Sequence, residues 1–308
     1  MKSFADRLAA AIREKNSVLM VGIDPRLDWL PPEVLRAAEE AGGSSLEIAE
    51  RALKRFGCDI VEAVAPYAVA VKPQLAYFEP YGSYGLRAYE TIVAAAREAG
   101  LLVVADGKRN DIGSTAEAYA AAFLGEESPL AADAVTVNAY LGEDGVAPFL
   151  ALAREHGKGI FVLVKTSNPS SGQFQDLVAD GRPIYEHVAA AVEQWSTPVG
   201  ESGYGPAGAV VGATYPEQLR QLRTAMPHAV FLVPGFGAQG GTADDVVGDF
   251  DENGLGAVVN SSRQVIFAYR DAGWQGADYR EAQAAAARTA RDQLNEALQR
   301  AGRSPAGN

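Results

Sequence analysis

The sequence is poor in the side chains that build disulfides and metal sites. Cys58 is the only cysteine, which excludes an internal disulfide and a cysteine-rich metal centre and is typical of a reducing compartment. The three histidines lack the spacing of metal ligands, so we assign them to structure: His156, His187 and His228. We therefore expect no metal site.

Long apolar runs are also missing. No stretch approaches the roughly 18 uninterrupted apolar residues of a membrane span. The first residues, MKSFADRLAAAIREKN, alternate charged and apolar side chains and lack the apolar core of a signal peptide. These absences predict a cytoplasmic protein with no membrane association.

Basic residues are outnumbered: 27 Lys and Arg stand against 39 Asp and Glu, a formal net charge of -12. A negative surface field repels a polyphosphate, so a nucleic-acid partner is not expected. A small anionic substrate would need Lys and Arg side chains concentrated in one pocket. Apolar residues make up 48% of the chain, enough for a large buried core.

Short apolar runs recur along the whole chain and alternate with segments of helical period. The eight runs begin near Val18, Ala68, Leu101, Ala134, Gly159, Gly208, Ala229 and Gly256. Helix-capping pairs are expected at Ser44 with Glu47, Ser114 with Glu117 and Thr242 with Asp245.

This alternation predicts an α/β protein whose parallel sheet is covered by helices, and eight units favour a closed (β/α)8 TIM barrel. A doubly wound open sheet is the competing architecture, but its glycine-rich dinucleotide turn is absent after the first strand. We expect a single domain over residues 1–308, with a leading helix near residues 3–15 and a closing helix from about Tyr279 to Arg300. The last residues, GRSPAGN, are expected to form a short, frayed polar tail.

In such a barrel the chemistry lies at the carboxyl ends of the strands, where polar residues follow each apolar run. These residues are Asp24, Lys72, Asp106 with Lys108, Asn138, and Lys165 with Thr166 and Ser167. Period-two alternation places Asp106 and Lys108 on one face of their strand, and Lys72 could lie within reach. Together with Asp111 they would form an alternating Lys/Asp array.

A simpler interpretation is that these charges form ordinary salt bridges around the barrel rim. Asp111 could merely favour the dipole of the following helix, and Asp24 before Pro25 could be a turn former. The glycines of PGFGAQGG could likewise be only a turn. With the late Arg263, however, that segment suits a phosphate, which barrels often bind after strands seven and eight.

The blocks VGIDPR, VKPQ, ADGKRNDIGST, PGFGAQGG and the late arginine resemble, in order, the signature blocks of the orotidine 5'-phosphate decarboxylase family. The resemblance spans residues 18–270. KTSNPSS after the fifth strand and NSSR in the eighth are similar to a type 2 bacterial subgroup. The resemblance implies cofactor-free decarboxylation of orotidine 5'-phosphate (OMP) to UMP and CO2 in de novo pyrimidine biosynthesis.

The resemblance also implies roles for individual residues. Lys72, Asp106 and Lys108 would form the catalytic array, with Lys108 protonating C6 of the pyrimidine. Asp111 would complete this array from the partner subunit of a homodimer, with Thr115 beside it. The substrate-binding residues would be Asp24, Thr115, Asn138, Thr166, Ser167, Asn168, Gln239 and Arg263.

The resemblance places Asp24, together with Lys72 of the array, on ribose hydroxyls, and Gln239 and Arg263 on the phosphate. Ser167 would contact the pyrimidine amide edge, although Thr166 or Asn168 could take this role. Two rival functions stay open: a metal-dependent sugar-phosphate lyase or synthase of the same barrel superfamily, and a barrel that binds a nucleotide without catalysis.

Overall fold

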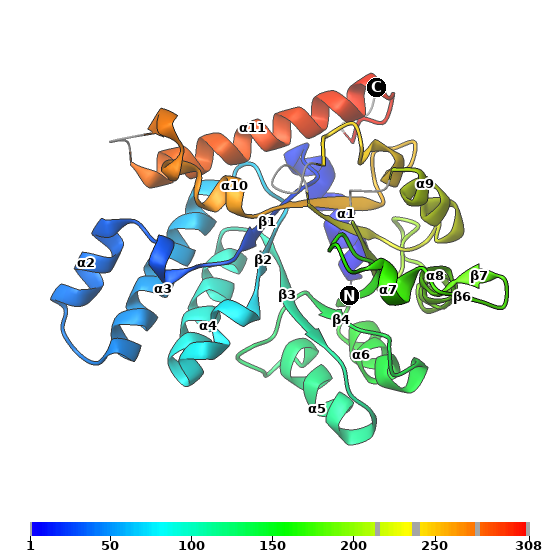
Figure 1. The fold of residues 1–308 in the computed structure, drawn as a ribbon, viewed down its shortest axis with the longest axis horizontal. Coiled ribbons are helices and arrows are strands. Elements are labelled where there is room, and N and C mark those ends of the chain that lie inside the picture. The colour runs from blue at the N-terminus through cyan, green and yellow to red at the C-terminus, as the bar shows by residue number, and fades with distance from the viewer. Residues whose placement is uncertain (1, 213–215, 236–240, 275–277, 306–308) are drawn as a thin grey trace.

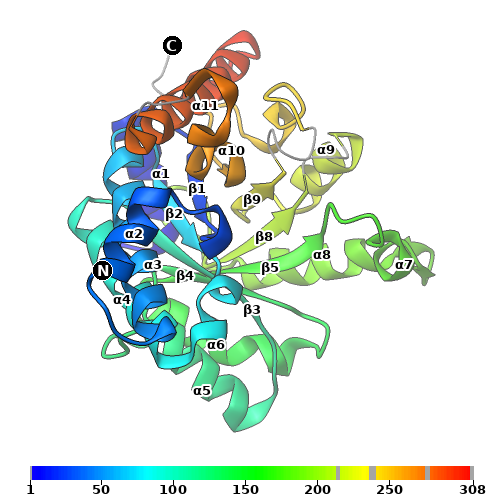
Figure 2. The same cartoon turned by 60° about the vertical axis from the view of Figure 1, so that its left-hand side comes forward.

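In the computed structural model, which describes residues 2–212, 216–235, 241–274 and 278–305, eight parallel strands close into one barrel. The order around the barrel is β1-β10-β9-β8-β5-β4-β3-β2 (Figures 1 and 2). The strands are β1 (Leu19–Ile23), β2 (Ala70–Pro73), β3 (Leu102–Arg109), β4 (Ala134–Val137), β5 (Gly159–Lys165), β8 (Ala207–Val211), β9 (Phe231–Pro234) and β10 (Ala257–Ser261). Each lies where the sequence predicted a strand, and the TIM barrel is confirmed.

The helices surround the barrel (Figure 2). They are α1 (Phe4–Lys15), α2 (Pro32–Glu40), α3 (Ser45–Val64), α4 (Gly82–Glu98), α5 (Gly113–Leu124), α6 (Glu143–Glu155), α7 (Gly172–Gln175), α8 (Ile184–Trp195), α9 (Pro216–Ala225), α10 (Arg263–Ile266) and α11 (Tyr279–Arg300). The predicted leading and closing helices are α1 and α11. No helix of the described residues is long and apolar enough to cross a bilayer.

The fifth βα connection carries an addition that the sequence did not predict. Between β5 and α8 the chain forms the short helix α7 and a two-stranded antiparallel hairpin, β6 (Val178–Ala179) and β7 (Arg182–Pro183). The hairpin extends from the side of the barrel, next to α8 (Figure 1). This addition forms one wall of the barrel mouth.

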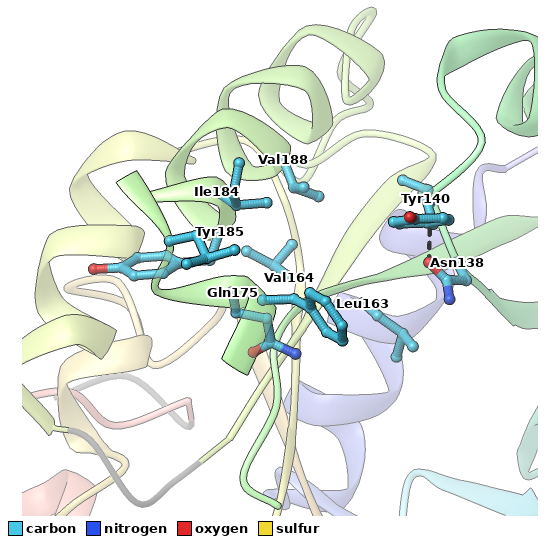
Figure 3. Close-up of a pocket in the computed structure, with 11 residues that line it drawn as sticks. Asn138, Tyr140, Leu163, Val164, Gln175, Ile184, Tyr185 and Val188 are labelled. Atoms are coloured by element: carbon cyan, nitrogen blue, oxygen red, sulfur yellow. Dashed lines mark hydrogen bonds between the residues drawn. The ribbon is translucent and has the colours of Figure 1, made fainter. Parts of the chain in front are cut away.

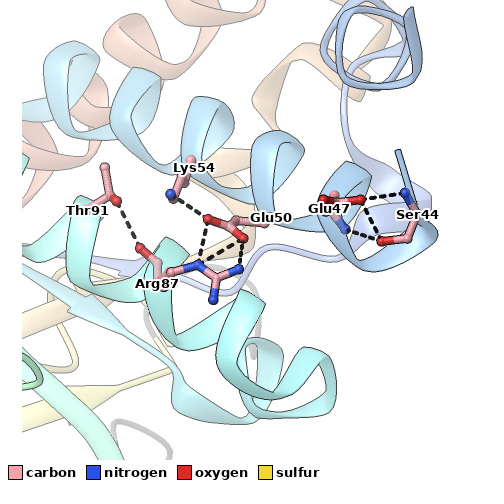
Figure 4. Close-up of polar contacts among 6 residues, drawn as sticks. All are labelled: Ser44, Glu47, Glu50, Lys54, Arg87 and Thr91. Carbon is pink, nitrogen blue, oxygen red and sulfur yellow. Dashed lines mark hydrogen bonds and ion pairs between the residues drawn. The ribbon is translucent and has the colours of Figure 1, made fainter. Parts of the chain in front are cut away.

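The three predicted capping pairs have different outcomes. Ser44 and Glu47 form a reciprocal capping box on α3, with the Ser44 N–H donating to Glu47 Oε2 at 2.7 Å (Figure 4). Thr242 and Asp245 exchange the same kind of bonds, but a short 3-10 helix over Val247–Asp249 follows instead of an α-helix. Ser114 does not cap α5, which begins at Gly113 after Ile112.

The two ends of the barrel differ in how they are covered. At the amino end Phe4 of α1 packs on Phe161 of β5, with ring centroids 5.8 Å apart. On the same end Arg303 donates to the carbonyls of Val247 and Phe250, at 2.7 and 2.6 Å, and Pro305 is buried. The prediction of a frayed tail is therefore wrong as far as Pro305, because Arg303 caps the carbonyls that end the 3-10 helix. The carboxyl end holds the polar cavity.

Polar contacts also tie neighbouring outer helices together. Glu50 of α3 accepts hydrogen bonds from Lys54 on its own helix and from Arg87 on α4 (Figure 4). These contacts lower the pKa of the Glu50 carboxyl to about 2, with the Arg87 hydrogen bond as the largest cause. They lie outside the barrel and take no part in the site.

Candidate active site

Asp106 is the centre of the charged array. One carboxylate oxygen, Oδ2, accepts from Lys72 Nζ at 2.5 Å and from Gln74 Nε2 at 3.0 Å. The other, Oδ1, accepts from Lys108 Nζ at 2.6 Å and from Thr136 Oγ1 at 2.9 Å. The donors come from the ends of β2, β3 and β4, so the barrel closure assembles the group.

The electrostatics of the array follow from this geometry. Burial alone would raise the pKa of the Asp106 carboxyl, but Lys72 and Lys108 outweigh burial and hold the pKa well below its usual range. Burial would lower the pKa of Lys72, and the charges of Asp106 and Asp24 reverse the effect, so its pKa is raised. Asp106 and Lys72 therefore stay ionised, and the contacts of the array fix both charges in place.

Lys108 is the more accessible of the two ammonium groups. Its side chain is 46% exposed, whereas the Lys72 side chain is 7% exposed. Lys108 has a φ of 46°, a left-handed conformation that costs energy in a residue with a side chain. Its backbone N–H donates to Thr136 Oγ1 at 2.9 Å. Thr136 thus holds both the backbone of Lys108 and the carboxylate that pairs with its ammonium.

Asp24 follows β1 and takes part in the same charge cluster. Its Oδ1 is buried and has no hydrogen-bond partner. Burial raises the pKa of Asp24 despite the opposing charge of Lys72 and a hydrogen bond to Ser262. An unpaired buried acceptor beside Lys72 is suited to a ligand hydroxyl, which supplies the missing donor.

A cavity of about 400 Å³ opens beside the array. Among its lining residues are Lys72, Asp106, Lys108, Thr166, Ser167 and Asn168, all predicted from the sequence. Asn138 lines a neighbouring apolar pocket instead, where its Oδ1 accepts from the Tyr140 N–H at 3.0 Å (Figure 3). The side chain of Asn138 is thus used in a turn, and the structure does not bring it to the cavity beside the array.

The residues predicted to come from a partner subunit do not line this cavity. Asp111 accepts from the Ile112 N–H at 2.9 Å, and Thr115 is exposed in the first turn of α5. Ile112 between them is 52% exposed. Neither Asp111 nor Thr115 lines the cavity of its own chain.

The phosphate residues lie partly outside the described chain. Gln239 falls within residues 236–240, so its predicted position is outside the described residues. Arg263 is exposed at the first position of α10, directly after β10. Gly235, at the end of β9, has a φ of 97°, which favours glycine. The two blocks follow neighbouring strands, β9 and β10.

Sequence reasoning missed Gln74, Thr136 and Gln175, which join the array or the cavity wall. A signal existed for Thr136, because period two places it on the same strand face as Asn138. Gln74 belongs to the VKPQ block but had no assigned role. Gln175 lies in the unpredicted helix α7, so no pattern pointed to it.

The other candidate groups have structural partners. His228 Nδ1 lies 2.5 Å from Glu193 Oε1, His187 Nε2 lies 2.8 Å from the Ala179 carbonyl, and His156 lies near Glu126. Within the described parts of the chain, no cluster of His, Cys, Asp and Glu could hold a metal ion. Both Asp106 oxygens are already occupied by ammonium groups and neutral donors. The donor set therefore does not fit a divalent cation.

Together these features define a (β/α)8 barrel whose carboxyl end holds a fixed Lys/Asp array beside a cavity of about 400 Å³. The chain belongs to the orotidine 5'-phosphate decarboxylase / HUMPS family, whose model matches residues 18–273.

Individual relatives agree over nearly the full length. An orotidine 5'-phosphate decarboxylase of Rhodopirellula baltica is 49% identical over 303 residues, which cover 97% of this chain and 99% of that protein. A solved structure from Toxoplasma gondii, described as a proposed orotidine-monophosphate decarboxylase, has a TM-score of 0.80 at 34% identity and covers 98% and 99% of the two chains. The Leishmania donovani OMP decarboxylase has a TM-score of 0.73 at 33% identity, covering 96% and 98%.

Proposed function

We propose that this protein is an orotidine 5'-phosphate decarboxylase, a carboxy-lyase that converts OMP to UMP and CO2 in pyrimidine biosynthesis. The observation that carries the proposal is the Asp106 carboxylate held between Lys72 and Lys108 at 2.5 and 2.6 Å, at the edge of the cavity. Family membership over nearly the whole chain supports it. The metal-dependent lyase is not favoured, because the Asp106 oxygens are already occupied.

The chemistry suits a fixed ammonium. When the bond between C6 and the carboxylate breaks, its electron pair stays on C6, in the ring plane, where the pyrimidine π system does not delocalise it. The Lys108 ammonium stabilises the developing charge and then transfers a proton to C6. Solvent reprotonates the amine, and CO2 departs. Asp106 holds Lys108 in place and, beside the substrate carboxylate, adds repulsion that favours its loss.

The remaining contacts are proposed on the same basis. Asp24, with its unpaired buried oxygen, and Lys72 would hold ribose hydroxyls. Thr166, Ser167 and Asn168 line the side of the cavity proposed for the pyrimidine. Gln239 and Arg263 would bind the phosphate. Asn138 is the weakest of the proposed substrate residues, since its side chain faces the neighbouring pocket.

We further propose a homodimer in which Asp111 and Thr115 complete the partner's site. Exposed apolar side chains near Asp111 and along the mouth support a covered face: Ile112, Tyr140, Leu141, Phe174 and Leu177. Mixing inactive Asp111→Ala and Lys108→Ala proteins after reversible dissociation should restore roughly a quarter of wild-type activity, because each heterodimer has one intact site. No restoration would contradict the shared site.

We also propose that the protein is cytoplasmic and has no nucleic-acid partner. It is supported by the lone, half-buried Cys58 and the net charge of -12.

The decisive experiment follows the loss of OMP absorbance in the presence of EDTA. Wild-type protein should turn over rapidly, and Lys108→Ala should lose at least about a thousandfold in kcat. Lys54→Ala, on the outer helix α3, is the matched control and should retain wild-type activity. Absence of turnover by folded wild-type protein would refute the decarboxylase and favour the sugar-phosphate enzyme.

A further inference from the structure

The added segment after β5 is fixed to the strand end by two pairs of side chains. Lys165, whose side chain is 2% exposed, pairs with Asp176 at 2.5 Å. The residues next to this pair, Thr166 after Lys165 and Gln175 before Asp176, also contact each other. These contacts hold α7 against the mouth of the barrel, beside the segment proposed to meet the pyrimidine.

Gln175 makes two hydrogen bonds with Thr166. Its Oε1 accepts from the Thr166 backbone N–H at 3.0 Å, and its Nε2 donates to Thr166 Oγ1 at 2.7 Å. Because that hydroxyl receives a donor, its own hydrogen is directed elsewhere, and it donates to Asn168 Oδ1 at 2.6 Å. The chain of bonds runs from Gln175 through Thr166 to Asn168 and gives each group one orientation.

This chain of bonds also decides which groups remain for a ligand. Both donors of Thr166 are used, one by Gln175 and one by Asn168. Asn168 presents its oxygen to Thr166, and its Nδ2 donates to no other described residue. The amide nitrogen of Asn168 is therefore available on the cavity wall, where Ser167 also lies.

Gln175 lies between two cavities and lines both of them. Gln175 and Leu163 line both the catalytic cavity and the apolar pocket of about 420 Å³ beside it. Figure 3 shows the apolar pocket, with Tyr140 on one side and Ile184 and Val188 on the other. The amide of Gln175 is bonded to Thr166 on the catalytic side. Removing the Gln175 amide would release Thr166 on the side of the cavity proposed for the pyrimidine. It would leave the contacts of the Lys/Asp array intact.

We propose that Gln175 is a positioning residue for pyrimidine recognition. It does not contact the substrate; it orients Thr166 so that Ser167 and Asn168 present their polar groups to the amide edge of the base. The inference rests on the proposed decarboxylase function. It assigns base contact to Ser167 and Asn168 and removes Thr166 from direct contact.

The test compares two ligands that differ only in the base. UMP carries the pyrimidine, ribose and phosphate, whereas ribose 5-phosphate lacks the pyrimidine. Gln175→Met fills similar space without the amide and should weaken UMP inhibition roughly tenfold, since oriented hydrogen bonds to the base are lost. Inhibition by ribose 5-phosphate should change less than about twofold. Gln173→Ala, an exposed glutamine of the same helix, is the control and should change neither constant.

The outcomes separate this inference from the proposed function. If wild-type protein decarboxylates OMP and Gln175→Met keeps wild-type UMP inhibition, only the role of Gln175 is refuted. Equal weakening of both ligands would also refute it, because that pattern indicates a general distortion of the site. If the wild-type protein neither binds UMP nor turns over OMP, the proposed function fails first.

Discussion

Two buried aspartates at opposite ends of the barrel have pKa values shifted in opposite directions. Asp106, 4% exposed at the carboxyl end, accepts four hydrogen bonds from side chains, and its pKa is held below the usual range. Asp249, fully buried near the amino ends of β9 and β10, has no hydrogen-bond partner on either carboxylate oxygen. Burial raises its pKa to about 8, against the charges of Arg223 and Arg303.

The difference lies in how the neighbouring cations are used. Lys72 and Lys108 direct their ammonium groups at Asp106. Arg223 instead donates to backbone carbonyls, including those of Ala229 and Gly256, and Arg303 donates to those of Val247 and Phe250. Burial alone therefore does not decide the charge of a carboxyl; the charges of ammonium groups aimed directly at it, with their hydrogen bonds, do. The catalytic end is built to keep its charge, whereas the amino end is built for packing.

The largest expected effect comes from removing the carboxylate of the catalytic end. Asp106→Ala should lower the free energy of unfolding by about 3–5 kcal/mol at pH 7, because it leaves the Lys72 ammonium buried without its main counter-charge. Without Asp106, burial lowers the pKa of Lys72, so the folded variant binds fewer protons than its unfolded chain. Its stability should therefore rise as the pH increases from 7 towards 10.

Urea unfolding at pH 7 and at pH 9.5 measures both effects. Asp271→Ala, an exposed aspartate without a side-chain bond in the described chain, is the matched control and should not change the unfolding midpoint. If Asp106→Ala lowers the free energy of unfolding by the same amount at both pH values, Lys72 is not a buried charge left without its counter-charge.

At the amino end the same kind of change should stabilise the protein. The folded state keeps a proton on Asp249 up to about pH 8, whereas the unfolded chain releases it near pH 4. Between these values the wild type loses stability as the pH rises, and Asn does not titrate. Asp249→Asn should therefore gain stability relative to wild type, and the gain should grow by roughly 1–3 kcal/mol from pH 5 to pH 7.

Parallel urea titrations of wild type and Asp249→Asn at the two pH values test this expectation. A gain independent of pH, or a loss, would mean that Asp249 is ionised and paired with Arg223 or Arg303. The contrast between the two aspartates would then disappear.

The smallest expected effect comes from removing the Thr136 hydroxyl, which contacts both Asp106 and the Lys108 backbone. Thr136→Val removes the donor to Asp106 and the acceptor for the Lys108 N–H. It should cost about 1 kcal/mol of stability and lower kcat roughly tenfold, with little change in KM, because Lys108 loses its exact placement. Thr136→Ser keeps the hydroxyl and should retain most of the activity. Equal kcat values for Val and Ser would exclude this role.

The fold was predictable from sequence because its signals are local. The eight barrel strands lie where apolar runs occur, and α1 and α11 match the predicted leading and closing helices. Prediction failed where tertiary contacts replace local signals. Ser114 does not cap α5, and the hairpin of β6 and β7 was not predicted, because each of its strands is only two residues long.

The site was predictable only in part. Strand ends and period two identified Lys72, Asp106 and Lys108, because the ends of parallel strands meet at one rim. Nothing local indicated that Gln175 would return to Thr166, or that Asn138 would turn to the neighbouring pocket. The tail was also misjudged, since the bonds of Arg303 join segments more than fifty residues apart.

By itself, then, the sequence determined the order of strands and helices and which chemical groups stand at the strand ends, because apolar periodicity and chain direction are local properties. The tertiary structure alone decided which of these groups meet. Closure of the barrel brings Lys72, Thr136 and Asp106 together across some thirty residues of chain, and it leaves Asp249 buried without a hydrogen bond. Cations aimed at a buried carboxyl fix its charge, and the Lys72 cation that meets Asp106 comes from a distant part of the sequence.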